Sequence, residues 1–542
     1  MDSSDLTVAE LIEQGLNEHR AGRLAQAQAA YRQVLAIEPE HAEALHLLGV
    51  AAHQTGDGDR AIAFIRRAIA LDGTRSNFYN NLGVALTDLG RLAEAETELR
   101  ACLRLSPDFA NGHYNLGNAL DKLGRLAEAE ASYREALRLE PDYPDALNNL
   151  GHVLNQLGRP LEAEERLRTG LCLRPGSSGS LNNLGIALFD QCRLDEAETV
   201  YREALRLQPD FPDARNNLAY ALLKAGRYEE GWEEHEWRWR AKHMAGGVRS
   251  FSAPLWQGEP IGERVILLHA EQGQGDTLQF CRYAPLMRSK VVLEVQPTLV
   301  RLLSRLPGVS QVIGRGEALP SFELHCPLLS LPRAFGTTLQ TVPARVPYLA
   351  ADPRDVELWN DRLAGLRGLK VGLVWAGEPR AHAPELAAID VRRSIALSGL
   401  APLAEIRGIT FVSLQKGGPA AQATHPPAGM TLFDPTADLH DFADTAALIE
   451  ALDLVISVDT SVAHLAGALG KPVWLLNRYD ACWRWLLNRD DSPWYPSLRQ
   501  FRQTSPGDWP GVIECVREAL LGLVANTSIG KPPDDSRARM RR

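Results

Sequence analysis

Residues 454–474 read LVISVDTSVAHLAGALGKPVW and contain the clearest fold signal in the second half of the chain. The first five residues are short, apolar and rich in β-branched side chains, which is typical of a buried strand. Asp459, Thr460 and Ser461 follow the strand and are able to cap a helix. Apolar residues then recur at helical spacing until Gly470, which ends the helix, and the last four residues begin another extended run. The stretch therefore predicts a strand–helix–strand unit of a parallel sheet.

The turn after the first strand of this unit is a candidate anion site. A helix begins there, so free backbone N–H groups and the positive end of the helix dipole point at one place, where a phosphate binds well. Asp459 and His464 lie within one helical turn of that place. On residue types alone two interpretations stay open: both side chains contact a ligand, or Asp459 only caps the helix and His464 only packs.

Composition limits the possible classes of protein. The 542 residues allow about two to four domains, and 45% apolar and 23% charged residues are typical of globular proteins. A net charge of −10 argues against nucleic acid or an anionic membrane as the main partner. The acidic start predicts no secretory signal, and no apolar run approaches the roughly 20 residues that span a bilayer. Seven scattered cysteines without a C-x-x-C motif favour a cytoplasmic protein without structural zinc.

The first half of the chain repeats every 34 residues. Small residues at two fixed positions let paired helices approach closely, and a proline near the end of most repeats stops the second helix. The glycines are Gly15, Gly49, Gly83, Gly117, Gly151 and Gly185, and the alanines are Ala27, Ala61, Ala95, Ala129, Ala163 and Ala197. The pattern resembles a tetratricopeptide array over residues 8–245, with six full repeats and a modified seventh, which implies an all-α superhelix.

One position on the first helix of the repeats is asparagine five times, at Asn81, Asn115, Asn149, Asn183 and Asn217. Equal spacing predicts a line of amides along the inner wall of the array. An amide both donates and accepts hydrogen bonds, so it can bracket a peptide unit without reading side chains. We therefore expect an extended polypeptide as the partner of the array. The alternative is that these asparagines serve helix packing.

The seventh repeat is rewritten after its first helix and carries Trp232, Trp237 and Trp239. Three indole rings are unfavourable in water. We expect them to dock the array on the next domain, rather than to form a platform for a sugar.

Two α/β domains are expected after the array, over residues 250–366 and 367–525. The first begins with a buried strand, 264–269, and a tight turn with Gly273 and Gly275, where backbone can approach a ligand. A helix over 277–287, strands over 290–295, 309–313 and 323–326, and a helix over 354–367 follow.

The second α/β domain begins with a strand over 369–375. Arg393 ends a polar loop, and a guanidinium beside a glycine turn suits a diphosphate. A strand over 410–414 ends in Gln415 and Lys416, and Lys416 is a candidate for the leaving phosphate, although a solvent-facing lysine is equally consistent. Residues 526–542 are predicted to be a disordered tail.

The motif D-T-S-x-x-H-L-A-x-A-L-G-K-P at residues 459–472 resembles the nucleotide-sugar motif of the ADP-heptose heptosyltransferase family, which usually has glycine in place of Ser461. This resemblance implies the GT-B fold, two Rossmann-like domains that face each other across a cleft. It also implies that the turn from Asp459 through Thr460 and Ser461 to His464 binds a nucleotide sugar. Asp276 follows Gly275 where that family has a Gly-Asp pair, which implies that Asp276 is the catalytic base. Asp276 as a helix cap is the alternative, and His269 is a second candidate base.

The layout resembles that of the protein O-linked N-acetylglucosamine transferases, which have such repeats before a GT-B half. Together the two resemblances imply an inverting glycosyltransferase that transfers a sugar from a nucleotide donor to a Ser or Thr hydroxyl of a polypeptide in the array. The resemblance to the heptosyltransferases implies a bacterial origin. No D-x-D motif follows a strand, so we expect no metal and no cofactor beyond the nucleotide sugar as co-substrate. Two alternatives stay open: a heptosyltransferase-like enzyme for a glycan or lipid-linked saccharide, and a non-catalytic tetratricopeptide scaffold with a degenerate transferase domain.

Overall fold

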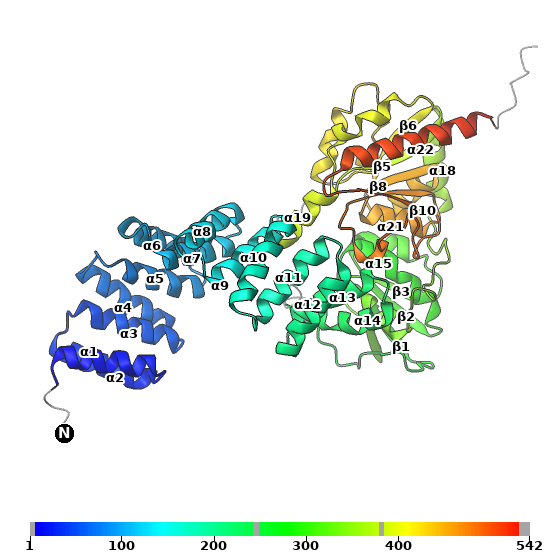
Figure 1. Ribbon diagram of the computed structural model, residues 1–542. Helices are drawn as coiled ribbons and strands as arrows, with labels where there is room; N and C mark the ends of the chain where they lie inside the picture. The colour runs from blue at the N-terminus through cyan, green and yellow to red at the C-terminus, as the bar shows by residue number, and fades with distance from the viewer. Residues whose placement is uncertain (1–5, 242–248, 379–383, 530–542) are drawn as a thin grey trace, which may run out of the picture. The chain divides into compact units, whose positions relative to one another are not determined.

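The computed structural model describes residues 6–241, 249–378 and 384–529. The chain divides into two compact units, Met1–Gln191 and Cys192–Arg542. The first unit is built from helices alone, and the second contains further helices and two sheets (Figure 1). Among the described residues, no helix is both long and apolar enough to cross a bilayer.

The first unit consists of paired helices at the predicted 34-residue period. Glycine is needed where the two helices of a pair touch, because a Cβ at Gly83 would lie 2.4 Å from Cγ of Leu99, and a Cβ at Gly117 would lie 2.6 Å from Cε1 of Tyr133. The described helices are α1 (Val8–Arg20), α2 (Leu24–Ile37), α3 (Ala42–Gln54), α4 (Gly58–Leu71), α5 (Ser76–Asp88), α6 (Leu92–Leu105), α7 (Ala110–Lys122), α8 (Leu126–Leu139), α9 (Pro144–Gln156), α10 (Pro160–Leu173) and α11 (Ser178–Asp190). The predicted all-α array is confirmed.

The second unit begins with further helices of the repeat pattern: α12 (Leu194–Leu207), α13 (Pro212–Lys224), α14 (Tyr228–His235) and the 3-10 helix η1 (Glu236–Arg240). A four-stranded parallel sheet follows, in the order β3-β2-β1-β4. Its strands are β1 (Val265–His269), β2 (Lys290–Val295), β3 (Val309–Gly314) and β4 (Leu324–Pro327), with helices α15 (Gln274–Phe280), α16 (Val300–Leu303), α17 (Leu331–Ala334) and α18 (Pro353–Leu363).

The helix expected over 277–287 differs from prediction. It begins at Gln274 as α15 and gives way to a 3-10 helix over Cys281–Leu286. The physical reason is Pro285, which has no backbone N–H and cannot continue an α-helical ladder.

The second sheet has six parallel strands in the order β10-β9-β8-β5-β6-β7. Its elements are β5 (Leu369–Val374), α19 (Pro384–Arg393), β6 (Ile409–Ser413), β7 (Leu432–Phe433), α20 (Phe442–Glu450), β8 (Leu454–Val458), α21 (Ser461–Ala468), β9 (Val473–Asn477), β10 (Leu498–Arg502) and α22 (Trp509–Ile529). The strand order reverses between β8 and β5, and ligands of open α/β sheets bind outside the carboxyl ends of the strands at such a switch point.

The disordered tail is predicted to start at residue 526, and this start is wrong. α22 runs to Ile529 and so enters the segment 526–542 that the sequence predicts to be disordered. A helix already formed gains one hydrogen bond for each residue added, which favours extension past the amphipathic part. Residues 530–542 lie outside the described residues.

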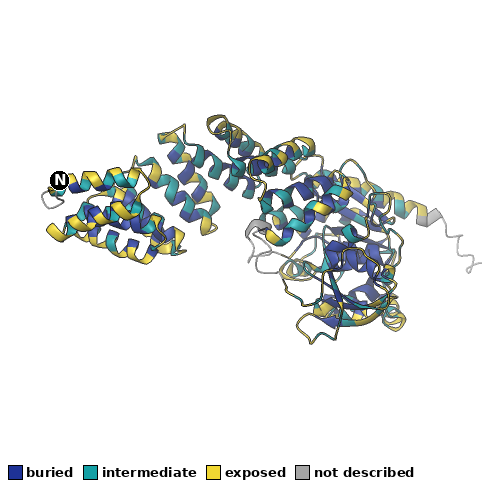
Figure 2. Ribbon diagram, turned by 90° about the horizontal axis from the view of Figure 1, so that it is seen from below, coloured by how far each residue is buried: buried dark blue, intermediate teal, exposed yellow. Residues whose placement is uncertain are grey.

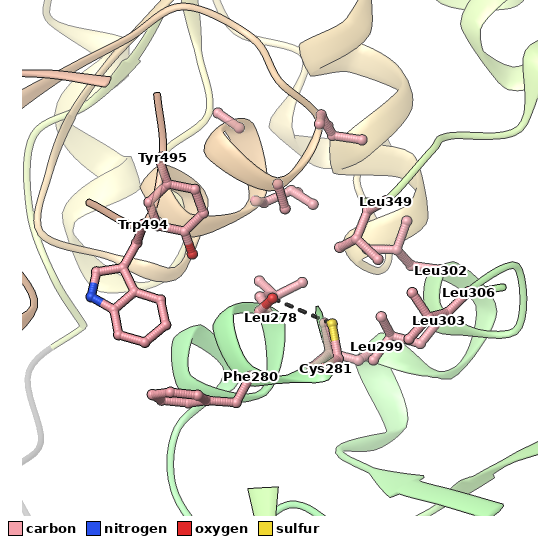
Figure 3. Packing of buried hydrophobic residues seen from close by; sticks show 14 of the residues in the cluster. Leu278, Phe280, Cys281, Leu299, Leu302, Leu303, Leu306, Leu349, Trp494 and Tyr495 are labelled. Carbon is pink, nitrogen blue, oxygen red and sulfur yellow. Dashed lines mark hydrogen bonds between the residues drawn. The ribbon is translucent and has the colours of Figure 1, made fainter. Parts of the chain in front are cut away.

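One continuous core joins the parts of the second unit, and its buried residues gather in and around the sheets (Figure 2). Trp232 of α14 is buried in this core, and its indole N–H donates to the backbone oxygen of Thr337 at 3.1 Å. Figure 3 shows Phe280 of α15 close to Trp494, with ring centroids 5.7 Å apart. Residues of both sheets contribute to the same cluster, so within this unit the two α/β domains and the end of the repeat pattern pack as one body.

Candidate active site

The turn between β8 and α21 lies at the switch point of the six-stranded sheet. Asp459 follows β8 directly, and Thr460 is the N-cap of α21 with extended backbone, φ −139° and ψ 171°. The Thr460 hydroxyl lies 3.1 Å from the hydroxyl of Ser457 and does not cap the helix. The backbone at the start of α21 is therefore not covered by the capping side chain that the sequence predicts.

Arg393 reaches this turn from the end of α19. Its Nη1 donates to the backbone oxygen of Asp459 at 3.1 Å, and its Nη2 pairs with Asp390 at 2.7 Å. Gly377, after β5, is in close contact with the guanidinium, because a Cβ there would lie 2.5 Å from Nε of Arg393. The structure thus brings the predicted arginine and the predicted turn together across the switch point.

Gln415 and Lys416 are engaged with backbone instead. The Gln415 side-chain oxygen accepts from the N–H groups of Trp375 at 3.0 Å and Ala376 at 2.9 Å. The Lys416 ammonium donates to the backbone oxygens of Thr436 at 2.8 Å and Leu439 at 2.9 Å. Both side chains hold the strand ends in place. Among the described residues, neither makes a hydrogen bond or ion pair with the turn at Asp459.

The turn before α15 packs directly on α21. Gly273 is the N-cap of α15, and its N–H donates to Asp276 Oδ2 at 3.0 Å, so Asp276 also takes part in capping. A Cβ at Gly275 would lie 3.0 Å from Cδ2 of His464 and 3.6 Å from Cα of Ser461. The two turns that the sequence singles out, on different α/β domains, therefore lie against each other.

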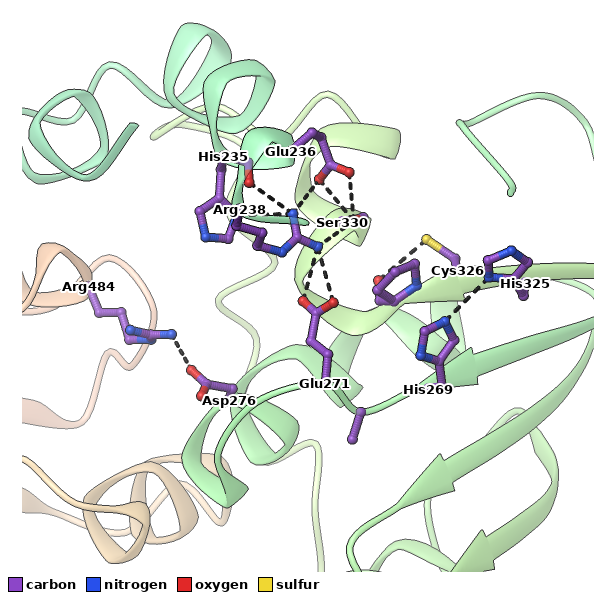
Figure 4. A network of polar contacts seen from close by, with 12 residues as sticks. His235, Glu236, Arg238, His269, Glu271, Asp276, His325, Cys326, Ser330 and Arg484 are labelled. Carbon is purple, nitrogen blue, oxygen red and sulfur yellow. Dashed lines mark hydrogen bonds and ion pairs between the residues drawn. The ribbon is translucent and has the colours of Figure 1, made fainter. Parts of the chain in front are cut away.

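Asp276 carries an ion pair with Arg484, from the segment that follows β9 (Figure 4). The Arg484 Nε donates to the side-chain oxygen of Gln279 at 2.8 Å, and its guanidinium lies over the ring of Trp483 at 4.3 Å. Burial opposes the charge of Arg484, but the Asp276 carboxylate raises the pKa of that guanidinium above its ordinary value. Sequence reasoning missed Arg484 as a site residue, because only the fold brings 484 to 276.

His464 packs in the core between the two domains. Its Nδ1 lies 2.9 Å from the hydroxyl of Tyr495, and its ring stacks on Trp485 with centroids 5.2 Å apart. Burial lowers the pKa of His464 to about 3, so the ring is neutral at ordinary pH. Its packing role is what the structure describes, and its contact with a donor stays a prediction.

His269 lies at the end of β1, and its Nε2 is 3.3 Å from Nδ1 of His325 (Figure 4). Burial lowers the pKa of His269 to about 3, which makes it a weak base. Glu271, which the sequence did not single out, lies between this pair and Asp276. Burial raises the pKa of Glu271 to about 7, although Arg238 contacts it at 3.0 Å and acts in the opposite direction.

Helix α13 borders the Asp276–Arg484 pair. It packs against the 3-10 helix η9 (Trp483–Trp485) that carries Arg484. Burial raises the pKa of Tyr220 on this helix, and both Arg484 and Asp276 are near enough to its hydroxyl to alter it further. A cavity of about 540 Å³ lies at the end of α13, lined among others by Lys224, Gly226 and Leu486.

The asparagine ladder connects neighbouring repeats. All five asparagines are half-buried. Asn115 Nδ2 donates to Asn80 Oδ1 at 2.9 Å, Asn149 Nδ2 to Asn118 Oδ1 at 2.9 Å, and Asn183 Nδ2 to Asn148 Oδ1 at 3.1 Å. Asn81 Nδ2 lies 2.9 Å from Nε2 of His46. In the first unit, the side-chain N–H groups of these asparagines therefore form hydrogen bonds with the preceding repeat. Such bonds agree with the alternative that the asparagines serve helix packing.

Comparison with known proteins confirms the resemblance to tetratricopeptide arrays and the resemblance to heptosyltransferases. Residues 83–124 and 117–158 match the family TPR repeat, and residues 12–76 and 182–232 match the family Tetratricopeptide repeat. Residues 437–481, which include β8, α21 and the Asp459 turn, match Glycosyltransferase family 9 (heptosyltransferase). Separate family matches therefore support the resemblance of the repeats and the resemblance of residues 459–472.

Protein FlbA of Caulobacter vibrioides is similar at 26% identity over 328 residues, which cover 56% of this chain and 54% of FlbA, about half of that protein. Among solved structures, PilF of Pseudomonas aeruginosa matches with a TM-score of 0.36 and 22% identity over 39% of this chain and 95% of PilF. YrrB, a TPR protein with an unusual peptide-binding site, matches with a TM-score of 0.30 and 22% identity over 34% of this chain and 95% of YrrB.

Proposed function

We propose that this chain is a glycosyltransferase that moves a sugar from a nucleotide diphosphate donor to a hydroxyl group of a polypeptide bound by the repeats. The observation that carries the proposal is the contact of the two turns. Gly275, which precedes Asp276 in one α/β domain, lies against Ser461 and His464 of the other, and these two residues are within the segment 437–481 that matches glycosyltransferase family 9. Transfer of a sugar from a nucleotide donor to a hydroxyl group requires a base for the hydroxyl proton and a site for the diphosphate, here proposed on facing domains.

The reaction follows from these positions. The acceptor hydroxyl gives its proton to the Asp276 carboxylate, and its oxygen attacks the anomeric carbon of the sugar. The bond from that carbon to the diphosphate oxygen breaks, and the diphosphate leaves with the electron pair. A single displacement of this kind inverts the anomeric carbon. Arg393, on the backbone oxygen of Asp459, is placed to balance the leaving charge at the start of α21.

The acceptor is proposed to be a polypeptide because tetratricopeptide arrays are protein-binding modules. Helix α13 supports this assignment, since it carries Asn217 and packs against η9, whose Arg484 pairs with Asp276. A segment bound along α13 would pass close to the base. The proposed enzyme works in the cytoplasm, where nucleotide sugars are made, and its seven free cysteines fit a reducing compartment.

A second candidate is transfer to a glycan or lipid-linked saccharide, with the repeats recruiting partners only. The observation in its favour is the ladder itself, because the N–H groups of Asn115, Asn149 and Asn183 already donate to the preceding repeat. Because these N–H groups are already bonded, a peptide would have to form hydrogen bonds with the amide oxygens or with other groups of the inner wall.

Intact-mass analysis of proteins that co-purify with this chain, with and without a panel of nucleotide sugars, tests the proposal. We expect a mass increase of one sugar on a bound protein, and its loss with Asp276→Asn. Asp438→Asn is the matched control, since Asp438 is an exposed carboxylate paired with Arg362. Transfer that survives Asp276→Asn contradicts the assignment of the base. Transfer to a saccharide that is insensitive to alanine at the ladder positions supports the second candidate.

A further inference from the structure

Arg484 is a largely buried cation that pairs with a carboxylate of the other α/β domain. Its side chain is 11% exposed, and it pairs with Asp276, whose side chain is 18% exposed. The turn that carries Asp276 lies against the start of α21, because a Cβ at Gly275 would lie 3.6 Å from Cα of Ser461. The charge of Asp459, just before α21, also raises the pKa of Arg484. The guanidinium therefore contacts the candidate base beside the turn where the donor's diphosphate is expected.

Arg484 is also held in position by two hydrogen bonds and one ring contact. Nε donates to Gln279 at 2.8 Å and Nη1 to Cys482 Sγ at 3.1 Å, and the flat face rests on Trp483. Asp276 is the carboxylate that Arg484 contacts directly. A guanidinium offers five N–H donors in a planar fork that also matches a phosphate.

The groups that face Asp276 come from several elements. The N–H of Gly273 and Arg484 from η9 contact it, and the ring of His464 lies against the neighbouring Gly275. Tyr220 from α13 and Glu271 are close enough for their pKa values to be raised by its charge. Among the described residues, Arg484 is the one cation in contact with this carboxylate. Oδ1 of Asp276 accepts from Arg484 and Oδ2 accepts from the N–H of Gly273, so an acceptor hydroxyl has to compete with these donors for the carboxylate.

We propose that Arg484 is a positioning residue that exchanges Asp276 for the diphosphate of the nucleotide donor. In the structure, Arg484 pairs with Asp276. When the donor occupies the Asp459 turn, the more highly charged diphosphate attracts the guanidinium, and the Asp276 carboxylate becomes free to take the acceptor's proton. Arg484 thereby makes the base available only when a donor is present. This inference rests on the proposed function, and it assigns a role in donor binding to a residue of η9.

Competition for one guanidinium has a measurable consequence, because removing one competitor favours the other. Asp276→Asn takes away the charge of the competing carboxylate while keeping its shape. We expect the variant to bind a nucleoside diphosphate about three- to tenfold more tightly, although it has lost the base. Arg484→Gln is expected to bind about tenfold more weakly. The double variant should resemble Arg484→Gln, since the gain from Asp276→Asn needs the arginine.

The experiment is calorimetric titration of the full chain with UDP, GDP, ADP and CDP, which requires no acceptor and no turnover. Arg484→Lys keeps the charge and should recover part of the affinity, so it replaces Arg484→Gln if that variant does not fold. Arg489→Gln is the matched control, because Arg489 lies in the same segment and pairs with Asp491. Its affinity should equal that of the wild-type chain.

Two results would overturn the inference, and they are distinguishable from failure of the proposed function. If the wild-type chain binds a nucleoside diphosphate but Asp276→Asn binds it equally or more weakly, the exchange is wrong and the donor site stands. If the double variant binds more tightly than Arg484→Gln, the gain does not pass through the arginine. If the wild-type chain binds none of the four nucleotides, the proposed function fails and the inference fails with it.

Discussion

His464→Asn should reduce the loss of stability that the second unit suffers in acid. The folded protein keeps His464 neutral, with a pKa of about 3, whereas the ordinary value is 6.5. Between these two values the unfolded chain binds a proton that the folded chain does not. Stability from this residue is therefore fully present above pH 6.5 and is lost as the pH falls toward 3.

The magnitude follows from the difference between the two pKa values of His464. Each pH unit below 6.5 removes about 1.4 kcal/mol of unfolding free energy through His464, or about 2 kcal/mol at pH 5. Asparagine cannot bind that proton, and its amide can still face the Tyr495 hydroxyl in place of Nδ1. The variant loses the ring that stacks on Trp485, so we expect it to be less stable by about 1–3 kcal/mol at pH 7.5. The difference between the two proteins should then shrink by about 2 kcal/mol at pH 5.

Other groups titrate in the same range, so the difference between proteins is the quantity to measure. Burial raises the pKa of Glu271 to about 7, so the folded protein binds that proton first and gains stability as the pH falls from about 7 toward 4.5. Burial lowers the pKa of His269 to about 3, which has the opposite effect. Both contributions are present in wild type and variant and cancel in the difference.

The assay is urea unfolding at several values between pH 7.5 and pH 5, followed by tryptophan fluorescence, to which Trp485 beside His464 contributes. The control is His440→Asn, since His440 is exposed and should leave the pH dependence unchanged. A difference between wild type and His464→Asn that stays constant within about 0.5 kcal/mol over this range would refute the neutral, buried histidine.

Three further substitutions test the packing and the site. Gly117→Ala places a Cβ 2.6 Å from the ring of Tyr133, so thermal unfolding of the first unit should show a loss of about 2 kcal/mol, and an unchanged transition would contradict the close contact. Gly275→Ala places a Cβ 3.0 Å from His464, so calorimetry should show weaker nucleotide binding, and the variant should lose about 1 kcal/mol of stability. Unchanged nucleotide affinity would contradict the proposal that the two turns form one binding site. Lys416→Met removes two bonds to backbone oxygens and should lower stability by about 1–2 kcal/mol without weakening nucleotide binding; a large loss of affinity would restore Lys416 to the phosphate site.

Part of the candidate site was accessible from the sequence and part was not. Asp459, Ser461 and Gly275 stand out because turn and cap residues at strand ends obey local rules, and the structure brings their turns together. Arg484 carries no such signal, since a W-R-W run is equally consistent with packing. Glu271 is one residue among many acids along the chain, and only its burial against Arg238 distinguishes it.

The sequence by itself determined the repeating helix pairs and the strand–turn–helix unit at Asp459, because both depend on spacing along the chain. A 34-residue period places glycine where two helices touch, and an apolar run followed by a capping residue specifies strand and helix whatever surrounds them. Only the tertiary structure decided which ends meet. Asp276 and Arg484 are far apart in sequence, and the packing of both sheets around a shared core brings them together as an ion pair. Burial and pairing of charge are properties of the packed interior, so no local pattern could reveal them.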